Sequence, residues 1–414
     1  MKLCDHDACT GCEVCSIVCP TKSISMKADT LGFYYPEIDS LSCVDCHLCT
    51  QHCHILREKP RNESSVKKIY AAWHSDDKIR MMSTSGGAFS ALADAVFELN
   101  GYVVGAVYED NFTVVHRIAH DPKDLDAQRG SKYVQSRMIN ILPELKVLLK
   151  EHPVLFCGTP CQVSAVKCFV GENSNLYTVD IVCHGVGSPT VFKKYLEYLS
   201  EHYHANVNKF RFRSKVNSWR YPSVCASFDD NQKYICSGLI DPMFVGFNKD
   251  VFQRESCYQC QYTHIDRPSD ITISDFWGYE AINNDDLDDD YGISMVMVNT
   301  TNGGLLFEHA KTHMVIYERD LKQAMNGQPC LDHPTAKSPM RDEFLYDLDK
   351  SFEFLANKYF QPRYDFSPYY YYRANHTREK SARMKSTFRV IDAVSRRLKL
   401  QKIIINYIER KNKK

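Results

Sequence analysis

The middle of the chain alternates between short apolar runs and segments with helical apolar spacing. Short apolar runs bounded by turn residues predict strands, and they lie at 69–74, 102–108, 154–157 and 176–182. Apolar residues three or four positions apart predict helices, which are expected at 88–99, 139–150 and 189–202, with one more after Pro160. Strands and helices that alternate in this way are typical of an α/β region.

Further along the chain, strands follow one another with no helix between them. Antiparallel strands are predicted at 207–213, 221–228 and 233–236, and two apolar strands at 269–278 and 292–299. The large region therefore combines alternating and sequential strands, so we expect a mixed fold on the border between α/β and α+β.

Cysteine is the unusual residue in the composition. The chain has 414 residues, enough for two or three domains, and 18 of them are cysteines. Disulfide scaffolds are typical of small secreted domains, whereas the opening residues MKLCDHDACTGC hold no apolar stretch that would serve as a secretory signal. We therefore expect a cytoplasmic protein whose thiols serve metal or redox chemistry. No apolar run approaches the roughly 18 residues of a transmembrane helix.

Two cysteine runs near the N-terminus have the spacing of bacterial ferredoxins. The first is C-x2-C-x2-C-x3-C-P, and the second repeats it with His54 in place of the proline. In two-cluster ferredoxins the fourth cysteine of each run serves the other cluster. One 4Fe-4S cluster is therefore expected on Cys9, Cys12, Cys15 and Cys53, and the other on Cys43, Cys46, Cys49 and Cys19. Zinc is the alternative for a C-x2-C pair, and Cys4 is interpreted as a spare thiol.

A third set of cysteines is scattered through the large region. Two of them follow predicted strands, and a C-x2-C pair comes later. The expected ligands of a third cluster are Cys161, Cys183, Cys257 and Cys260. Cys157 is an alternative to Cys161 because both belong to the same turn. A catalytic pair of Cys183 with His184 is a rival interpretation, but adjacent residues rarely face each other.

Small residues precede the predicted helix at 88–99. Glycines and hydroxyls at a helix N-terminus can present backbone N–H groups to a phosphate, although they also cap helices that bind nothing. The chain contains neither a G-x-G-x-x-G after a strand nor a G-x4-G-K-[ST], so a standard dinucleotide fold or ATPase is not indicated. Lys plus Arg and Asp plus Glu both number 51, so the chain has no overall charge for binding nucleic acid.

Several short motifs occur in a characteristic order. They are Ser-x-Ser-Gly-Gly at 83–87, Ser-Lys-Tyr at 131–133, Gly-Thr-Pro-Cys-Gln at 158–162, Asp-x2-Cys-His-Gly at 180–185, the Cys257/Cys260 pair and Asp-x4-Asp-Phe-Trp-Gly at 270–278. Together they resemble the family of coenzyme F420 hydrogenase/dehydrogenase beta subunits over about residues 69–310. The resemblance implies a flavin-binding α/β domain with its own 4Fe-4S cluster, often fused to a two-cluster ferredoxin module. Members pass electrons between iron–sulfur centres and FAD, and some use a deazaflavin coenzyme.

The resemblance also implies roles for individual residues. The expected flavin-binding residues are Ser83, Ser85, Gly86, Gly87, Ser131, Lys132, Tyr133, Gly158 and Thr159. Lys132 would offer a cation to the pyrophosphate or the reduced ring. His184 is a candidate proton donor, with an oriented core histidine as the alternative. Arg211, Arg213 and Lys215 are candidates for an anionic substrate, with a solvated strand edge as the alternative.

The expected domains are a ferredoxin-like domain at 1–58, a linker at 59–68, a FAD- and iron–sulfur-binding domain at 69–335, and a C-terminal extension at 336–414. Residues 378–414 hold thirteen Lys or Arg and three acids. This segment would form a basic helix, either lying on an anionic membrane surface or partner or packed on its own domain. The acidic stretch 285–290 is interpreted as a solvated turn.

The predicted function is that of an FAD- and 4Fe-4S-dependent oxidoreductase. Its electrons would go to or from a deazaflavin coenzyme, a redox partner protein or an unidentified small-molecule substrate. The alternative is a non-catalytic electron-transfer subunit that docks on a larger redox enzyme. Nucleic acid is not an expected partner.

Overall fold

The computed structural model describes residues 3–57, 68–281 and 289–362, with a few single positions beyond them. The predicted linker, most of the acidic stretch 285–290 and nearly all of the basic tail lie outside the described residues. The chain forms two compact units. The first contains Met1–Phe192, Phe252–Asp288 and Ile293–Lys337, and the second contains Lys193–Val251, Asp289–Gly292 and Ser338–Lys414. The ferredoxin-like region belongs to the same compact unit as the large sheet.

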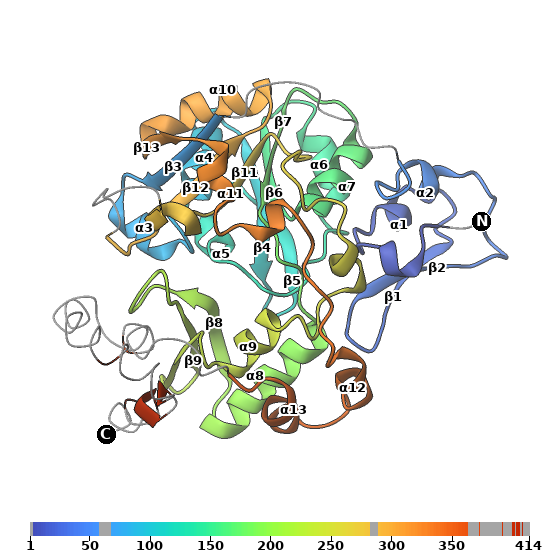
Figure 1. Ribbon diagram of the computed structural model, residues 1–414. Coiled ribbons are helices and arrows are strands. Elements are labelled where there is room, and N and C mark those ends of the chain that lie inside the picture. The colour runs from blue at the N-terminus through green and yellow to red at the C-terminus, as the bar shows by residue number, and fades with distance from the viewer. Residues whose placement is uncertain are drawn as a thin grey trace. The chain divides into compact units, whose positions relative to one another are not determined.

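An eight-stranded mixed sheet forms the centre of the first unit, in the order β13-β3-β12-β11-β7-β6-β4-β5 (Figure 1). The strands are β3 (Lys68–His74), β4 (Tyr102–Tyr108), β5 (Val114–Ala119), β6 (Val154–Gly158), β7 (Leu176–Ile181), β11 (Ile271–Asp275), β12 (Ser294–Val298) and β13 (Met314–Arg319). The inner strands β4, β6, β7 and β11 are parallel, whereas β5, β12, β3 and β13 pair antiparallel with their neighbours. The mixed α/β prediction is confirmed.

Helices cover both faces of this sheet (Figure 1). Beside the α-helices of the ferredoxin-like region, the first unit contains α3 (Asp77–Met82), α4 (Ala88–Glu98), α5 (Leu125–Gln128), α6 (Leu142–Leu148), α7 (Pro160–Val170), α10 (Thr301–Ala310) and α11 (Leu321–Met325). Leu92 of α4 and Phe307 of α10 belong to one buried cluster, and Leu145 of α6 and Val163 of α7 belong to another. Short 3-10 turns lie at His6–Ala8, Glu255–Gln259, Trp277–Ala281, Lys311–His313 and Pro329–Leu331.

The ferredoxin-like region is small and shares a core with the large sheet. It consists of α1 (Val14–Val18), β1 (Ile24–Ala28), β2 (Tyr34–Ile38) and α2 (Leu48–Gln51), with β1 and β2 antiparallel. The side chain of Val14 is fully buried in the cluster that includes α6 and α7. A region this short cannot bury much apolar surface alone, so packing on the sheet domain stabilises it.

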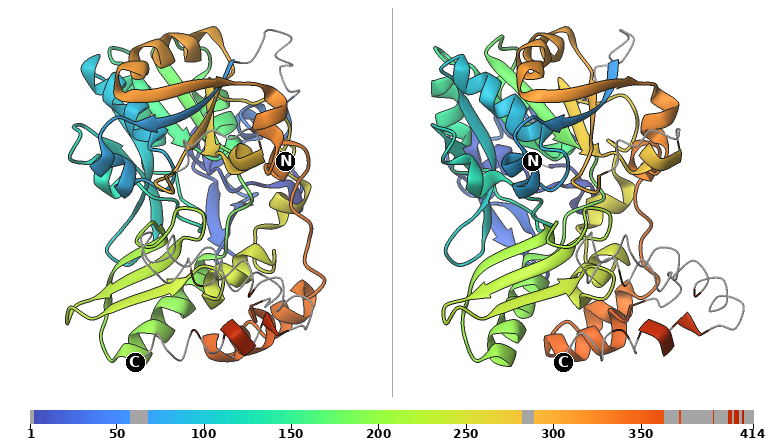
Figure 2. Two further views of the ribbon diagram at one scale, coloured as in Figure 1. Left: turned by 60° about the vertical axis from the view of Figure 1, so that its left-hand side comes forward. Right: turned by 90° about the vertical axis from the view of Figure 1, so that its left-hand side faces the viewer.

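The second unit contains a three-stranded antiparallel sheet in the order β10-β9-β8, coloured green in Figure 2. Its strands are β8 (Val207–Ser214), β9 (Ser223–Phe228) and β10 (Lys233–Ser237). Its helices are α8 (Pro189–Tyr203), which starts in the first unit, α9 (Pro242–Asn248), α12 (Arg341–Tyr346) and α13 (Phe352–Tyr359). Arg213 and Lys215 are buried, so a solvated strand edge is wrong for these two residues. Arg211 is exposed.

None of the described helices is long and apolar enough to cross a membrane.

Candidate functional site

The first thiol set surrounds one cavity in the ferredoxin-like region. Cys9, Cys12, Cys15 and Cys53 all line it, as the crossed ligand pattern predicts. Cys4 lines the same cavity. Cys4, interpreted from the sequence as a spare thiol, therefore lies against the first set.

The second thiol set surrounds a separate cavity, which Cys19, Cys43, Cys46 and Cys49 line. Of the eight ferredoxin-like cysteines, Cys46 alone is exposed. Within the described residues, no three His, Cys, Asp or Glu side chains are placed to ligate a single metal ion. The thiols instead stand around cavities, as the ligands of a multi-iron cluster do.

Both cysteine loops have the same unusual backbone. The residues before and after the second cysteine of each run are left-handed: Gly11 (φ 65°) and Glu13 (φ 65°) flank Cys12, and Asp45 (φ 54°) and His47 (φ 62°) flank Cys46. A non-glycine residue in this region is uncommon. The repeated turn is the local feature that lets three closely spaced cysteines line one cavity.

A third cavity gathers the four scattered cysteines of the sheet domain. Cys161 lies at the second position of α7, Cys183 follows β7, and Cys257 and Cys260 lie in and just after a 3-10 turn; all four line the cavity. Strands β6 and β7 are parallel neighbours, so the segments after them meet at one edge of the sheet. Cys157 is not among the lining residues. Burial, then the neighbouring thiol of Cys260, raises the pKa of Cys161 to about 11, so metal binding there would release protons.

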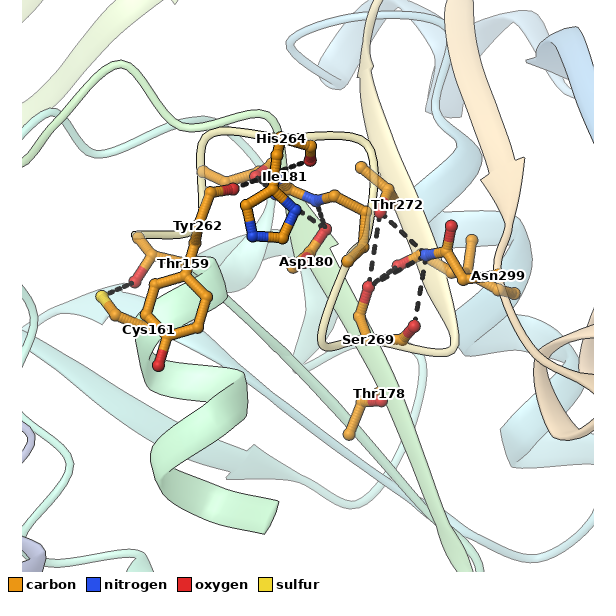
Figure 3. Close-up of polar contacts among 12 residues, drawn as sticks. Thr159, Cys161, Thr178, Asp180, Ile181, Tyr262, His264, Ser269, Thr272 and Asn299 are labelled. Carbon is orange, nitrogen blue, oxygen red and sulfur yellow. Dashed lines mark hydrogen bonds and ion pairs between the residues drawn. The ribbon is translucent and has the colours of Figure 1, made fainter. Parts of the chain in front are cut away.

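A buried ion pair holds the loop that follows Cys260. Arg267 and Asp180 are 1% and 0% exposed and lie 3.2 Å apart, from Nη2 to Oδ1. Arg267 also donates to the carbonyls of Tyr262 at 2.7 Å and Ile181 at 3.0 Å, and Figure 3 shows this network. One guanidinium thus ties the loop after Cys260 to the end of β7, just before Cys183.

His54, the residue that replaces the second motif proline, links the first and third thiol sets. It is buried, and its ring nitrogens contact the Tyr262 hydroxyl at 2.5 Å and the Thr10 hydroxyl at 2.9 Å. Tyr262 lines the third cavity, and Thr10 lines both the first and the third. Burial lowers the pKa of His54 to about 4, so the histidine is neutral at pH 7.

Glu13 anchors the first cysteine loop to the sheet domain. Its carboxylate is 1% exposed and accepts hydrogen bonds from the Arg137 guanidinium, at 2.7 and 2.9 Å, and from the backbone N–H groups of Met138 and Ile139. Sequence reasoning missed this role, although a carboxylate between two motif cysteines is an odd residue in a tight loop.

The loop at 83–87, which is expected to bind the flavin phosphates, contacts the Ser-Lys-Tyr motif at 131–133. Thr84 Oγ1 accepts from the backbone N–H of Ser131 at 2.9 Å. Ser83 Oγ donates to Ile79 O and Ser85 Oγ to Ile293 O. These two hydroxyls therefore serve the protein's own backbone, and Thr84, absent from the expected site residues, joins the motifs.

The two expected catalytic residues lie in different surroundings. Lys132 Nζ donates to the carbonyls of Ala127, Gln128 and Arg129, at the C-terminal end of α5. His184 lines the third cavity, with Nε2 3.5 Å from Thr335 Oγ1. Thr159 caps α7, and its hydroxyl lies 3.1 Å from Cys161 Sγ. The structure thus places His184 and Thr159 beside the third thiol set and Lys132 at a helix end.

Gly86 lies in close contact with neighbouring backbone. A Cβ there would collide with Ala72 O and lie 2.7 Å from the backbone nitrogen of Ser294. We expect Gly86→Ala to destabilise the protein by about 1–3 kcal/mol, as overpacking does, measured as a lower urea midpoint. Gly304→Ala is the control, because its Cβ would meet nothing nearer than 3.9 Å. Equal midpoints for the two variants would contradict the close approach.

Comparison with known proteins identifies the chain's relatives. Residues 69–143 match the family model "Coenzyme F420 hydrogenase/dehydrogenase, beta subunit N-term", and residues 152–324 match the companion model for the C terminus of the same beta subunit. The chain belongs to the family of coenzyme F420 hydrogenase/dehydrogenase beta subunits. Residues 8–55 match a 4Fe-4S dicluster domain, which supports the two iron–sulfur clusters predicted from the cysteine runs. The family is one of oxidoreductase subunits.

Among curated proteins, the chain is 26% identical over 187 residues to the F subunit of the F(420)H(2) dehydrogenase of Methanosarcina mazei. That match covers 43% of this chain and 52% of the relative, so the chain spans about half the length of that curated protein. A chain in a structure of the F420-reducing NiFe hydrogenase complex from Methanosarcina barkeri is 16% identical, with a TM-score of 0.44, covering 73% of this chain and 95% of that one.

Proposed function

We propose that this beta-subunit relative is an iron–sulfur flavoprotein oxidoreductase with three 4Fe-4S clusters and one FAD. Its electrons would go to or from a deazaflavin coenzyme or another reducible organic substrate. When bound, the clusters supply one-electron carriers, and the flavin supplies the exchange between single electrons and a hydride. Cytoplasmic location, the expected domain division and a redox partner protein belong to the same proposal.

The observation that carries the proposal is the adjacency of the first and third thiol sets. The third cavity is lined both by its own four cysteines and by Ala8, Thr10 and Ile55, which border Cys9 and Cys53. Two further side chains fix the positions of the two sets: His54 contacts both Thr10 and Tyr262, and Glu13 anchors the first cysteine loop to the sheet domain. Electrons that enter at the ferredoxin-like region would therefore need no domain movement to reach the third site.

The proposed flavin site rests on three motifs that the structure brings together in two places. The loops at 83–87 and 131–133 adjoin through Thr84 and Ser131, and Thr159 brings the Gly158-Thr159 motif beside Cys161. Proposed flavin contacts are therefore backbone groups of the first loop and side chains of the second. Lys132 and His184 keep their proposed roles of cation and proton donor.

The deciding experiment is anaerobic purification with iron, sulfide and flavin measured on one sample. About twelve irons, at four per cluster, with one FAD per chain are expected. About eight irons with FAD would remove the third cluster from the proposal. Eight irons without flavin would leave only a ferredoxin joined to a binding domain.

A non-catalytic electron-transfer subunit is the second candidate, because the curated relative is itself named as one subunit of a dehydrogenase. Reduction of deazaflavin by the isolated, fully loaded chain would exclude it. Turnover that appears only after a partner chain is added would favour it.

A further inference from the structure

Arg254 is a buried cation between the first and third thiol sets. Its side chain is 1% exposed. Nε donates to Cys9 O at 2.7 Å, and Nη2 lies 3.8 Å from Cys9 Sγ and donates to Tyr34 O at 3.0 Å. The same residue lines the third cavity together with its four cysteines.

No carboxylate neutralises this guanidinium among the residues that the structure describes. Nη1 donates to the side-chain amide oxygen of Gln135 at 2.9 Å, and the guanidinium lies 4.0 Å from the centre of the Tyr35 ring. Glu13 in the first cysteine loop and Glu255 beside Arg254 are paired with other cations, Arg137 and Lys337. Arginine stays protonated in proteins, and an uncompensated buried charge is strongly unfavourable.

The backbone is shaped to accommodate this side chain. Gly11, in the first cysteine loop, has a φ of +65°, and a Cβ there would lie 2.7 Å from both Arg254 Nη1 and Gln135 Nε2. A Cβ at this position would therefore displace the ends of the Arg254 and Gln135 side chains.

We propose that Arg254 is the shared counter-cation of two iron–sulfur sites, a positioning residue that sets the potentials of both. The inference rests on the proposed function, because thiolate-ligated clusters at these two cavities supply the negative charge that Arg254 lacks. Reduction adds one more negative charge to a cluster, so a nearby fixed cation favours the reduced form and raises the midpoint potential. Arg254 is not among the residues lining the second cavity, so the Cys19/Cys43/Cys46/Cys49 site serves as an internal control.

Three variants test whether the charge of Arg254 or the shape of its side chain matters, and a fourth serves as a control. Arg254→Gln removes the charge, and Arg254→Lys keeps it but loses the planar fork. Gln135→Glu leaves Arg254 in place and supplies the missing carboxylate to Nη1. As a control, Gln323→Glu in the capping box of α11 changes the net charge equally at a position that lines none of the three cavities.

The measurement is a dithionite titration of the intact, cluster-loaded chain, followed by electron paramagnetic resonance. Arg254→Gln and Gln135→Glu should lower the midpoint potentials of two clusters by about 59 mV, a tenfold change for a one-electron couple. The potential of the cluster at Cys19, Cys43, Cys46 and Cys49 should not shift. Arg254→Lys should restore most of the wild-type potentials, and Gln323→Glu should change nothing.

The outcomes distinguish this inference from the proposed function. Wild-type protein without three cluster signals would overturn the proposed function itself. Three signals that do not shift in Gln135→Glu, or that shift equally in Arg254→Lys and Arg254→Gln, would overturn the role of Arg254 alone. If Arg254→Gln fails to retain its clusters, Gln135→Glu carries the test, since it keeps the guanidinium in position.

Discussion

Replacement of Cys257 by alanine should lower the iron content from about twelve to about eight atoms per chain, a loss of one cluster of four irons. Cys257 lines the third cavity with three other cysteines, and no cysteine outside this set lines it, so no spare thiol stands ready to substitute. The two ferredoxin-like cavities do not include Cys257. Their clusters should remain reducible by dithionite, while electron transfer from them to bound flavin should stop.

Iron and sulfide analysis, combined with spin counting on the reduced protein, measures this effect. Cys168→Ala is the matched control, because Cys168 lies on α7 but lines none of the three cavities. Twelve irons retained by the Cys257 variant, or an equal loss in the Cys168 variant, would show that the third site is not an iron–sulfur site.

Asp180→Asn should destabilise the protein by about 3–5 kcal/mol, the usual result of removing one partner from a buried ion pair. The substitution leaves Arg267, 1% exposed, without its carboxylate. Of the contacts that tie Arg267 to β7, the ion pair would then be lost and the hydrogen bond to Ile181 O would remain. Because Cys260 precedes this loop, weaker retention of the third cluster should accompany the lower stability.

Urea unfolding of the anaerobic protein and the iron content after desalting test both effects. The double variant Asp180→Leu/Arg267→Met should recover much of the stability, since an apolar pair can replace a buried ion pair. Lys311→Gln, which breaks a largely exposed pair with Glu308, should cost under about 1 kcal/mol. If the urea midpoint of Asp180→Asn is as close to that of the wild type as the midpoint of Lys311→Gln, the ion pair does not stabilise the loop after Cys260.

Apolar patterning was sufficient to locate the inner strands. Strand β4 has the bounds expected for it, Tyr102–Tyr108, because both its faces are buried and the whole run is apolar. Edge strands β5 and β13 escaped prediction, since each mixes charged residues such as Arg117 and Glu318 with apolar ones. The helix expected at 139–150 is shorter, Leu142–Leu148, and has a proline in its first turn.

Spacing also grouped the cysteines of the two ferredoxin-like runs, because the ligands of each cluster lie close together in the sequence. The side chains that connect the thiol sets to one another could not be predicted from spacing. Arg254 meets Cys9 across 245 positions, and His54 meets Tyr262 across 208. Such pairs depend on how the ferredoxin-like loops pack against the sheet domain, and no local pattern records that packing.

The two ferredoxin-like sites differ in solvent exposure. We therefore expect oxygen and chelators to remove their clusters in a defined order. Cys46 is exposed, and Leu41 and Val44 beside it are 97% and 63% exposed. Cys9 is buried, and its site is backed by Arg254 and the sheet domain. Molecular oxygen and chelators will therefore strip the Cys19/Cys43/Cys46/Cys49 site first, so a preparation briefly exposed to air should lose its outermost carrier while the inner two remain.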